Sequence, residues 1–214
     1  MNPPLLEILL QLHFEPIELT SDRLQYFYRM NNDLLPETKA ADEPNVACYL
    51  SMDRLDCLTI SPECAELHSK RGVSFPTLRS SWARLLGSLL RIFSVSVLKQ
   101  ISLAYFNEIP IDDLRTFRTY MNIGIEMPAA LRERVEFFRS EFTYKYDFGE
   151  IKVWLQPDWN DQMQNYCIQL NLESRQLGPL EPEQLIAKIQ QLHEGIKDVF
   201  RQILSEDYIR SLPQ

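Results

Sequence analysis

His193 is the residue of this chain with the clearest capacity for acid–base chemistry. Helical geometry places it about 40° from Ile189, within an apolar stripe of the C-terminal segment. A histidine in such a stripe more often packs and bonds a nearby carbonyl than serves as a base. A general base also needs an oriented partner, and the sequence names no carboxylate for it. The sequence therefore indicates no catalytic residue and leans against an enzyme, without settling that question.

Potential metal ligands gather in residues Glu63–His68, and Cys57 lies seven positions before Cys64. Structural zinc sites usually take four ligands in two close pairs. The chain contains no C-x-x-C pair and no H-x-x-x-H. We therefore predict a solvated loop at Glu63–His68, and no metal or cofactor.

The thiols and glycines also argue against common active sites. The sequence has no G-x-S-x-G, Walker or G-x-G-x-x-G motif, and it contains only six glycines. The four cysteines show no paired spacing, which favours reduced thiols in the cytoplasm. Three of them, Cys48, Cys57 and Cys167, fall on apolar strands, where cysteine behaves as a small hydrophobic residue.

Charge is distributed unevenly along the chain. The net charge is −8, yet no acidic residue occurs between Glu66 and Glu108. The basic residues of that stretch contribute +6, so the rest of the chain sums to −14: Lys70, Arg71, Arg79, Arg84, Arg91 and Lys99.

This basic segment has three interpretations. It forms a docking face for a protein partner with an acidic surface, consisting of Arg84, Arg91, Lys70, Arg71 and Lys99. Alternatively, these residues pair with surplus carboxylates of their own chain. Nucleic-acid binding is the weakest of the three, because the overall charge is negative and few exposed aromatics could stack bases.

Aromatic residues suggest two further surfaces. Tyr26, Phe27 and Tyr28 cannot all be buried on one element, so an exposed aromatic patch is expected near residue 28. Trp154 and Trp159 flank a predicted turn at Pro157. Core packing or plugging of a strand end explains these two tryptophans better than a ligand platform.

Alternation of apolar and polar residues predicts most of the strands. They are expected at residues 5–14, 97–107, 142–155 with a turn or bulge at Gly149, and 166–172, with one bent or two short strands in 46–60. In the first of these, one face is apolar: Leu6, Ile8, Leu10, Leu12 and Phe14.

The clearest helix is predicted at residues 76–93, where Pro76 suits the first turn. Trp82 and Leu89 lie on its apolar stripe, and Arg84 and Arg91 lie opposite. A second amphipathic helix begins at Pro182, and shorter helices are expected at 21–29, 113–121 and 128–139.

These elements predict one α+β domain, a mainly antiparallel sheet with amphipathic helices packed on one face. The halves, about 1–110 and 111–214, each end in a proline-initiated amphipathic helix, which suggests an internal duplication. No secretory signal and no membrane-spanning stretch are recognisable, so we expect a cytoplasmic protein.

Three segments resemble a known family. Asn2-Pro3-Pro4-Leu5-Leu6-Glu7 leads into a strand, Ile101–Ile109 has the form x-L-x-Y-x-N-x-I, and the last helix contains Leu192-His193-x-x-Ile196-x-x-x-Phe200. Together they resemble a sporadically distributed family of uncharacterised prokaryotic proteins. The chain departs from the pattern at Ala104, where an arginine often precedes the tyrosine. The resemblance implies a fold and no activity, and its patchy distribution fits accessory genes such as those of defence systems or mobile elements.

The leading hypothesis is a non-enzymatic interaction or regulatory protein that acts in a protein complex. The alternatives are an enzyme or small-ligand-binding protein with a site between sheet and helices, and a nucleic-acid-binding accessory protein. A homo-oligomer is compatible with all three. A deep pocket with convergent polar groups would favour ligand binding, and a flat, basic or apolar face would favour a partner.

Overall fold

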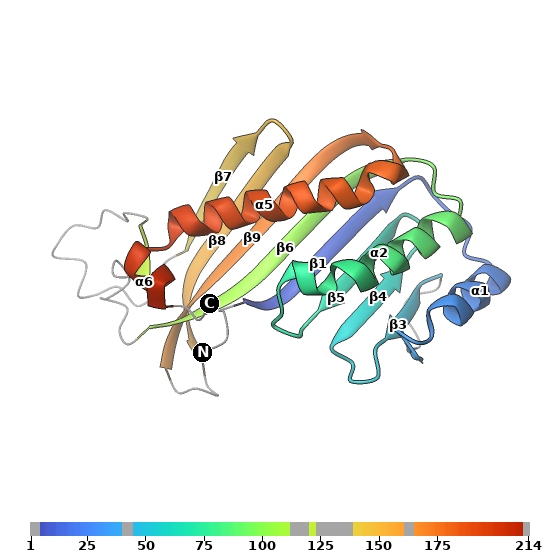
Figure 1. The fold of residues 1–214 in the computed structure, drawn as a ribbon, viewed down its shortest axis with the longest axis horizontal. Coiled ribbons are helices and arrows are strands. Elements are labelled where there is room, and N and C mark those ends of the chain that lie inside the picture. The colour runs from blue at the N-terminus through green and yellow to red at the C-terminus, as the bar shows by residue number, and fades with distance from the viewer. Residues whose placement is uncertain (1–4, 40–44, 112–119, 123–138, 161–164, 212–214) are drawn as a thin grey trace.

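The computed structural model describes residues 5–39, 45–111, 120–122, 139–160 and 165–211. Within them, nine strands form one sheet of antiparallel pairs in the order β2-β3-β4-β5-β1-β6-β9-β8-β7 (Figure 1). The strands are β1 (Leu5–Phe14), β2 (Glu37–Lys39), β3 (Ala47–Leu50), β4 (Asp56–Ile60), β5 (Cys64–Ser69), β6 (Leu98–Ile111), β7 (Ser140–Tyr146), β8 (Gly149–Asn160) and β9 (Asn165–Leu180).

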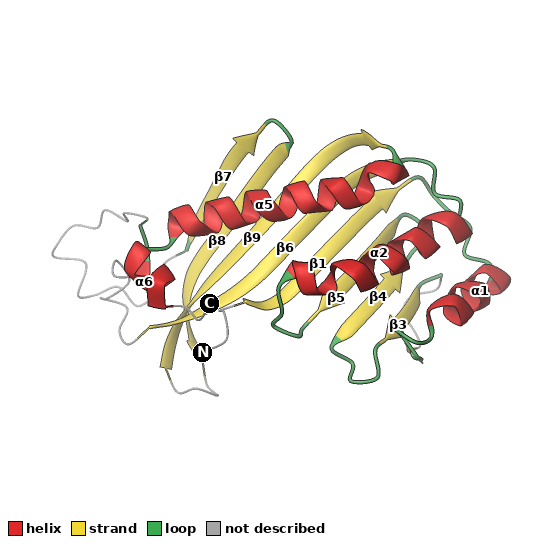
Figure 2. Ribbon diagram, viewed as in Figure 1, coloured by secondary structure: helices red, strands yellow, loops and turns green. Residues whose placement is uncertain are grey.

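The long helices lie on one face of this sheet. Figure 2 shows α1 (Ser21–Asn31), α2 (Phe75–Ile92) and α5 (Leu185–Ile203) on the same side. Helix α5 crosses β8, β9 and β6, whereas α2 crosses the strands of the N-terminal half (Figure 1). A 3₁₀ turn (Pro182–Gln184) precedes α5, and the short α6 (Glu206–Ser211) follows it. The predicted α+β architecture is confirmed.

The core fills the space between the sheet and α2 and α5. Trp82 is 2% exposed and Leu89 is fully buried, whereas Arg84 and Arg91 lie on the exposed side of α2, as the helical periodicity predicted. The strands contribute alternate residues to this layer, among them Leu10 and Leu103, which face each other across β1 and β6. We call this side of the sheet the helix face and the other side the open face.

The centre of the sheet is the β1–β6 pair, where an N-terminal half of the sheet, β1–β5, meets a C-terminal half, β6–β9; β6 begins at Leu98, inside the first of the predicted halves. In the N-terminal half β1 also pairs with β5, and in the C-terminal half β6 also pairs with β9. In each half the first strand lies at the centre of the sheet and pairs with the last strand of the same half. A long helix follows that last strand. This shared order agrees with the idea of a duplication, which stays a prediction.

Three local predictions were wrong. A register shift between Leu5 and Glu7 turns Leu5 into the core and leaves Leu6 47% exposed, because a bulge inverts the alternation beyond it. Residues Glu63–His68 do not form a solvated loop, since β5 covers Cys64–Ser69 and pairs with β1 and β4. Pro157 marks no turn, because β8 continues to Asn160.

A turn or bulge was predicted at Gly149, and the hairpin turn between β7 and β8 ends at this residue. Gly149 has a φ of +150°, and a Cβ there would lie 2.0 Å from the carbonyl oxygen of Arg175. Only glycine tolerates that approach without moving the backbone of β9. The helix predicted at 128–139 and nearly all of the one at 113–121 lie outside the described residues.

Candidate functional site

Arg71, one of the five predicted docking residues, closes the turn between β3 and β4. Its guanidinium donates to Asp53 at 2.7 and 2.9 Å and to Asp56 at 2.6 Å. The pKa of Asp53 is lowered to about 2, first by the hydrogen bond from Ser51, then by the backbone of Leu55 and by Arg71. Arg71 therefore holds this turn in place.

The two lysines of the predicted docking face also lie near carboxylates of the same chain. Lys70 Nζ is 3.6 Å from Glu7, and Lys99 Nζ is 3.2 Å from Glu15. The side chains are substantially exposed, so these ion pairs contribute little to the free energy of unfolding.

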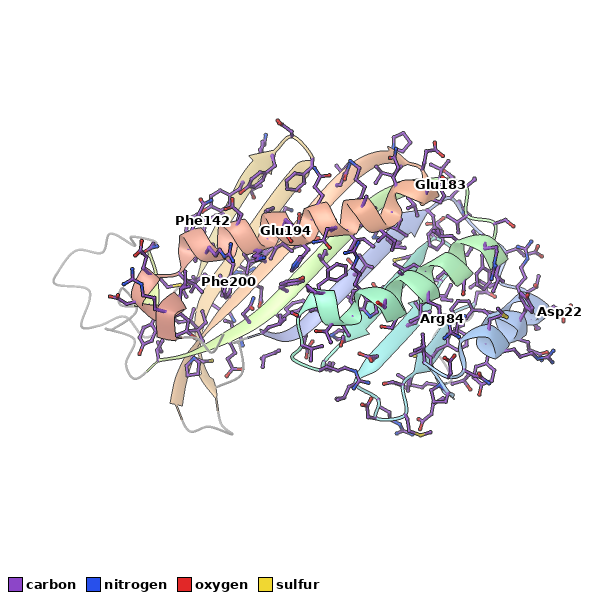
Figure 3. The ribbon with its side chains drawn as sticks, in the orientation of Figure 1. Asp22, Arg84, Phe142, Glu183, Glu194 and Phe200 are labelled. Atoms are coloured by element: carbon purple, nitrogen blue, oxygen red, sulfur yellow. The ribbon has the colours of Figure 1, made fainter. Side chains whose placement is uncertain are left out.

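Arg84, like Arg71, is held by three hydrogen bonds within the chain. Its guanidinium donates to both carboxylate oxygens of Asp33, at 2.6 and 2.7 Å, and to the Met30 carbonyl at 2.7 Å. The hydrogen bond from Arg84 lowers the pKa of Asp33. A forked pair of this kind fixes both position and direction, so Arg84 ties α2 to the end of α1 (Figure 3).

Arg91 differs from the other four. Its guanidinium has no ion pair or hydrogen bond with any residue that the structure describes, and it lies on the exposed side of α2. With Ile92 it lines a shallow groove of about 460 Å³, whose other wall is Asp22, Arg23 and Tyr26 of α1. We call these five residues the α1–α2 groove.

The aromatic residues of α1 divide as expected. Phe27 is fully buried against Tyr49 and Phe93, with ring centroids 5.3 and 6.1 Å away. Tyr28 is half-buried and donates to the Pro36 carbonyl at 2.9 Å. Tyr26 remains 53% exposed and lies in the α1–α2 groove.

His193 lies on the buried side of α5, 7% exposed, with its Nδ1 hydrogen-bonded to the hydroxyl of Tyr105 on β6. The ring also packs against Phe75, 5.3 Å away between centroids. Burial lowers the pKa of His193 and raises that of Tyr105. These shifts favour a neutral imidazole and a neutral phenol. Their hydrogen bond links α5 to β6. The packed histidine thus bonds a hydroxyl where a carbonyl was expected.

The thiols and acidic ligands do not assemble a metal site in the described part of the chain. No three histidine, cysteine or acidic side chains converge there. His68 instead pairs with Glu7 at 2.7 Å. Burial raises the pKa of Cys57 and of Cys64 to about 11, so both thiols are protonated near neutral pH and are poor nucleophiles.

A second cavity, of about 470 Å³, lies on the open face of the sheet. We call it the open-face pocket. It is lined by residues of β1, β6, β8 and β9, together with Arg139: Leu9, Gln11, Ala104, Phe106, Arg139, Trp154, Gln156, Gln169, Asn171, Leu172, Glu173 and Arg175. The sequence patterns did not predict this pocket, although period-two alternation places Phe106, Asn171 and Trp154 on the polar sides of their strands.

Polar contacts organise the floor of the open-face pocket. Glu173 Oε1 accepts from Ser102 Oγ at 2.6 Å and from Arg175 Nη2 at 3.0 Å. Gln156 Nε2 donates to Gln169 Oε1 at 3.1 Å. The Nε of Arg175 is buried and has no hydrogen-bond partner among the described residues. Arg175 also lines the pocket, and its guanidinium makes it a candidate contact for an anionic ligand.

Comparisons with known proteins supply no further identification. No family model matches the chain, and no curated protein matches it. The family resemblance of the three segments therefore stays a prediction. Among the helices described, none has the length and apolar character to cross a bilayer.

Proposed function

We propose that this chain is a non-enzymatic interaction or regulatory protein that docks a protein partner through the α1–α2 groove. The observation that carries the proposal is Arg91, a guanidinium without a carboxylate partner among the described residues, beside the half-exposed ring of Tyr26. Tyrosine and arginine are the residue types most often found at the energetic centre of protein interfaces.

The chemistry of the α1–α2 groove indicates the class of partner. Two guanidinium groups, Arg23 and Arg91, outnumber the single carboxylate of Asp22, and Tyr26 and Ile92 supply apolar surface. Such a surface fits an acidic segment that also carries an apolar side chain. Arg84, already bound to Asp33, supports the groove by fixing α1 against α2.

The setting of the proposed complex is the cytoplasm. All four cysteines are free thiols, which supports a reducing compartment. The resemblance to a sporadically distributed family supports an accessory role. Ligand binding is the second candidate. The open-face pocket supports it, although this pocket lies on the open face and not between sheet and helices, where the site was predicted; it is developed below.

The test uses two charge reversals on the same helix. Arg91→Glu changes the groove, and Arg79→Glu is the matched control, because Arg79 is exposed on α2 and does not line the groove. Partners captured from the native host by wild type and control, but lost with Arg91→Glu, are then purified and titrated against each variant by calorimetry.

We expect direct binding to the wild type and to Arg79→Glu, with at least a tenfold loss for Arg91→Glu. Binding should also weaken as salt rises, because exposed charges are screened beyond about 8–10 Å. Equal binding by Arg91→Glu and Arg79→Glu would refute the groove as the docking surface.

A further inference from the structure

Three side chains of the open-face pocket stand in one row across the sheet. Phe106 on β6 is opposite Asn171 on β9, and Asn171 is opposite Trp154 on β8. Neighbouring strands are about 4.8 Å apart, so the aromatic residues start about 10 Å apart with the amide between them. This arrangement suits a ligand with a flat ring system. An aromatic side chain would stack on the ring, and the carboxamide would form hydrogen bonds with its edge.

The amide of Asn171 is available for that role. It makes no hydrogen bond to any residue that the structure describes, although it lines the pocket. A carboxamide presents a donor and an acceptor side by side, the pairing with which asparagine reads the edge of adenine. Bases that lie outside a duplex are held by stacking on aromatic rings together with hydrogen bonds to their edges.

Strand β9 continues from this row with two charged residues on the same face. Asn171, Glu173 and Arg175 alternate along the strand and all line the pocket. At about 3.3 Å per residue, the backbone positions of Asn171 and Arg175 lie about 13 Å apart, with Glu173 halfway. An amide, a carboxylate and a guanidinium in this order match the base, the ribose hydroxyls and the phosphates of a nucleotide.

The anionic end of such a ligand would meet two arginines. Arg175 lines the pocket, and among the described residues its side chain bonds only Glu173, through one Nη. Arg139 lines the same pocket, is exposed, and makes no ion pair within the described residues. Guanidinium groups bind phosphate through paired hydrogen bonds. The cavity volume of about 470 Å³ lies in the usual range for small-molecule sites.

We propose that the open-face pocket binds a free adenine nucleotide. The base lies along the Phe106–Asn171–Trp154 row, the ribose lies beside Glu173, and the phosphates reach Arg175 and Arg139. The net charge of −8 disfavours a polynucleotide as the source of this chemistry, since backbone binding needs a broad basic surface. The site is separate from the α1–α2 groove, so neither proposal depends on the other.

Calorimetric titration of the purified chain with ADP tests the site. Asn171→Leu removes the amide at similar volume, and Gln100→Leu is the matched control, a carboxamide of β6 that does not line the pocket. We expect at least a tenfold weaker affinity for ADP in Asn171→Leu and no change in Gln100→Leu. Unchanged affinity in Asn171→Leu, or no heat of binding from ADP at millimolar concentration, would overturn the proposal.

Titrations of the wild-type protein with other ligands test the site without depending on whether a variant folds. Adenosine should bind more weakly than ADP because it lacks the phosphates, and GDP should bind more weakly because its base edge differs. A single-stranded oligonucleotide distinguishes the source of the nucleotide. Tighter binding by a ten-residue oligoadenylate than by ADP would overturn the proposal of a free nucleotide, and so would equal affinities for ADP and GDP.

Discussion

The two faces of the sheet are built from the same strands and differ in almost every physical respect. On β9, Leu170 and Leu172 are fully buried on the helix face, while Asn171 and Glu173 are only partly buried on the open face. The helix face gains its stability from apolar area removed from water. The open face places amides, charges and two aromatic rings in rows without a described helix above them. The contrast teaches that one alternating pattern supplies stability on one side and binding groups on the other.

The largest expected difference in stability is between truncating a buried leucine of the helix face and truncating an exposed leucine of the sheet. Leu89→Ala should lower the free energy of unfolding by about 2–5 kcal/mol, because Leu89 is fully buried between α2 and the sheet. Leu177→Ala, at a side chain that is 65% exposed, should change it by less than about 0.5 kcal/mol. Urea unfolding of both variants measures the difference. Similar losses would mean that the helix face is not the stabilising core.

A smaller loss of stability is expected when the hydrogen bond between Tyr105 of β6 and His193 of α5 is removed. Tyr105→Phe removes the partner of His193 Nδ1 and leaves a buried nitrogen without a hydrogen bond. The expected cost is about 1–3 kcal/mol, measured by urea unfolding near neutral pH. Tyr28→Phe, which loses a partly buried hydrogen bond to Pro36, is the control and should cost less.

The same histidine should make stability depend on pH. Burial lowers the pKa of His193 from its ordinary 6.5. Below that pH the unfolded chain takes up a proton that the folded chain resists, so the free energy of unfolding decreases until the lowered pKa is passed. His193→Gln should flatten this part of the profile between about pH 7 and pH 5. An unchanged slope would assign the acid sensitivity to other groups.

The smallest stability change is expected on the open face. Asn171→Leu should alter the free energy of unfolding by less than about 0.5 kcal/mol, because its amide makes no hydrogen bond to the described residues. Thermal melting compares it with Leu172→Ala, its fully buried neighbour on β9. A large loss for Asn171→Leu would mean that the open face also serves stability.

Local patterns predicted elements well because they depend on neighbouring residues. The stripe that contains Trp82 and Leu89 predicted the buried side of α2, and the alternation around Leu103 predicted β6. The pattern failed at Leu6, since a bulge depends on the partner strand. It also failed at Glu63–His68, where Ala65 and Leu67 alternate with polar residues over too short a span to stand out.

The candidate sites were harder to predict than the elements. The basic residues were visible as a run, but Asp33 and Asp53, which pair with Arg84 and Arg71, come from other parts of the chain. Of the five predicted docking residues, only Arg91 has no side-chain partner among the residues that the structure describes. The open-face pocket draws its lining from four strands, and single-sequence periodicity carries no information on which strands become neighbours.

The central β1–β6 pair has a consequence for the rate of folding. Leu10 and Leu103 lie far apart in sequence, yet their strands must pair to complete the sheet. Contacts of such long range fold slowly, because loop entropy is lost before the contact forms. During synthesis β1 emerges well before β6, and its free edge is exposed until β6 arrives. A chaperone or a pause in translation would therefore act most strongly while this edge is open.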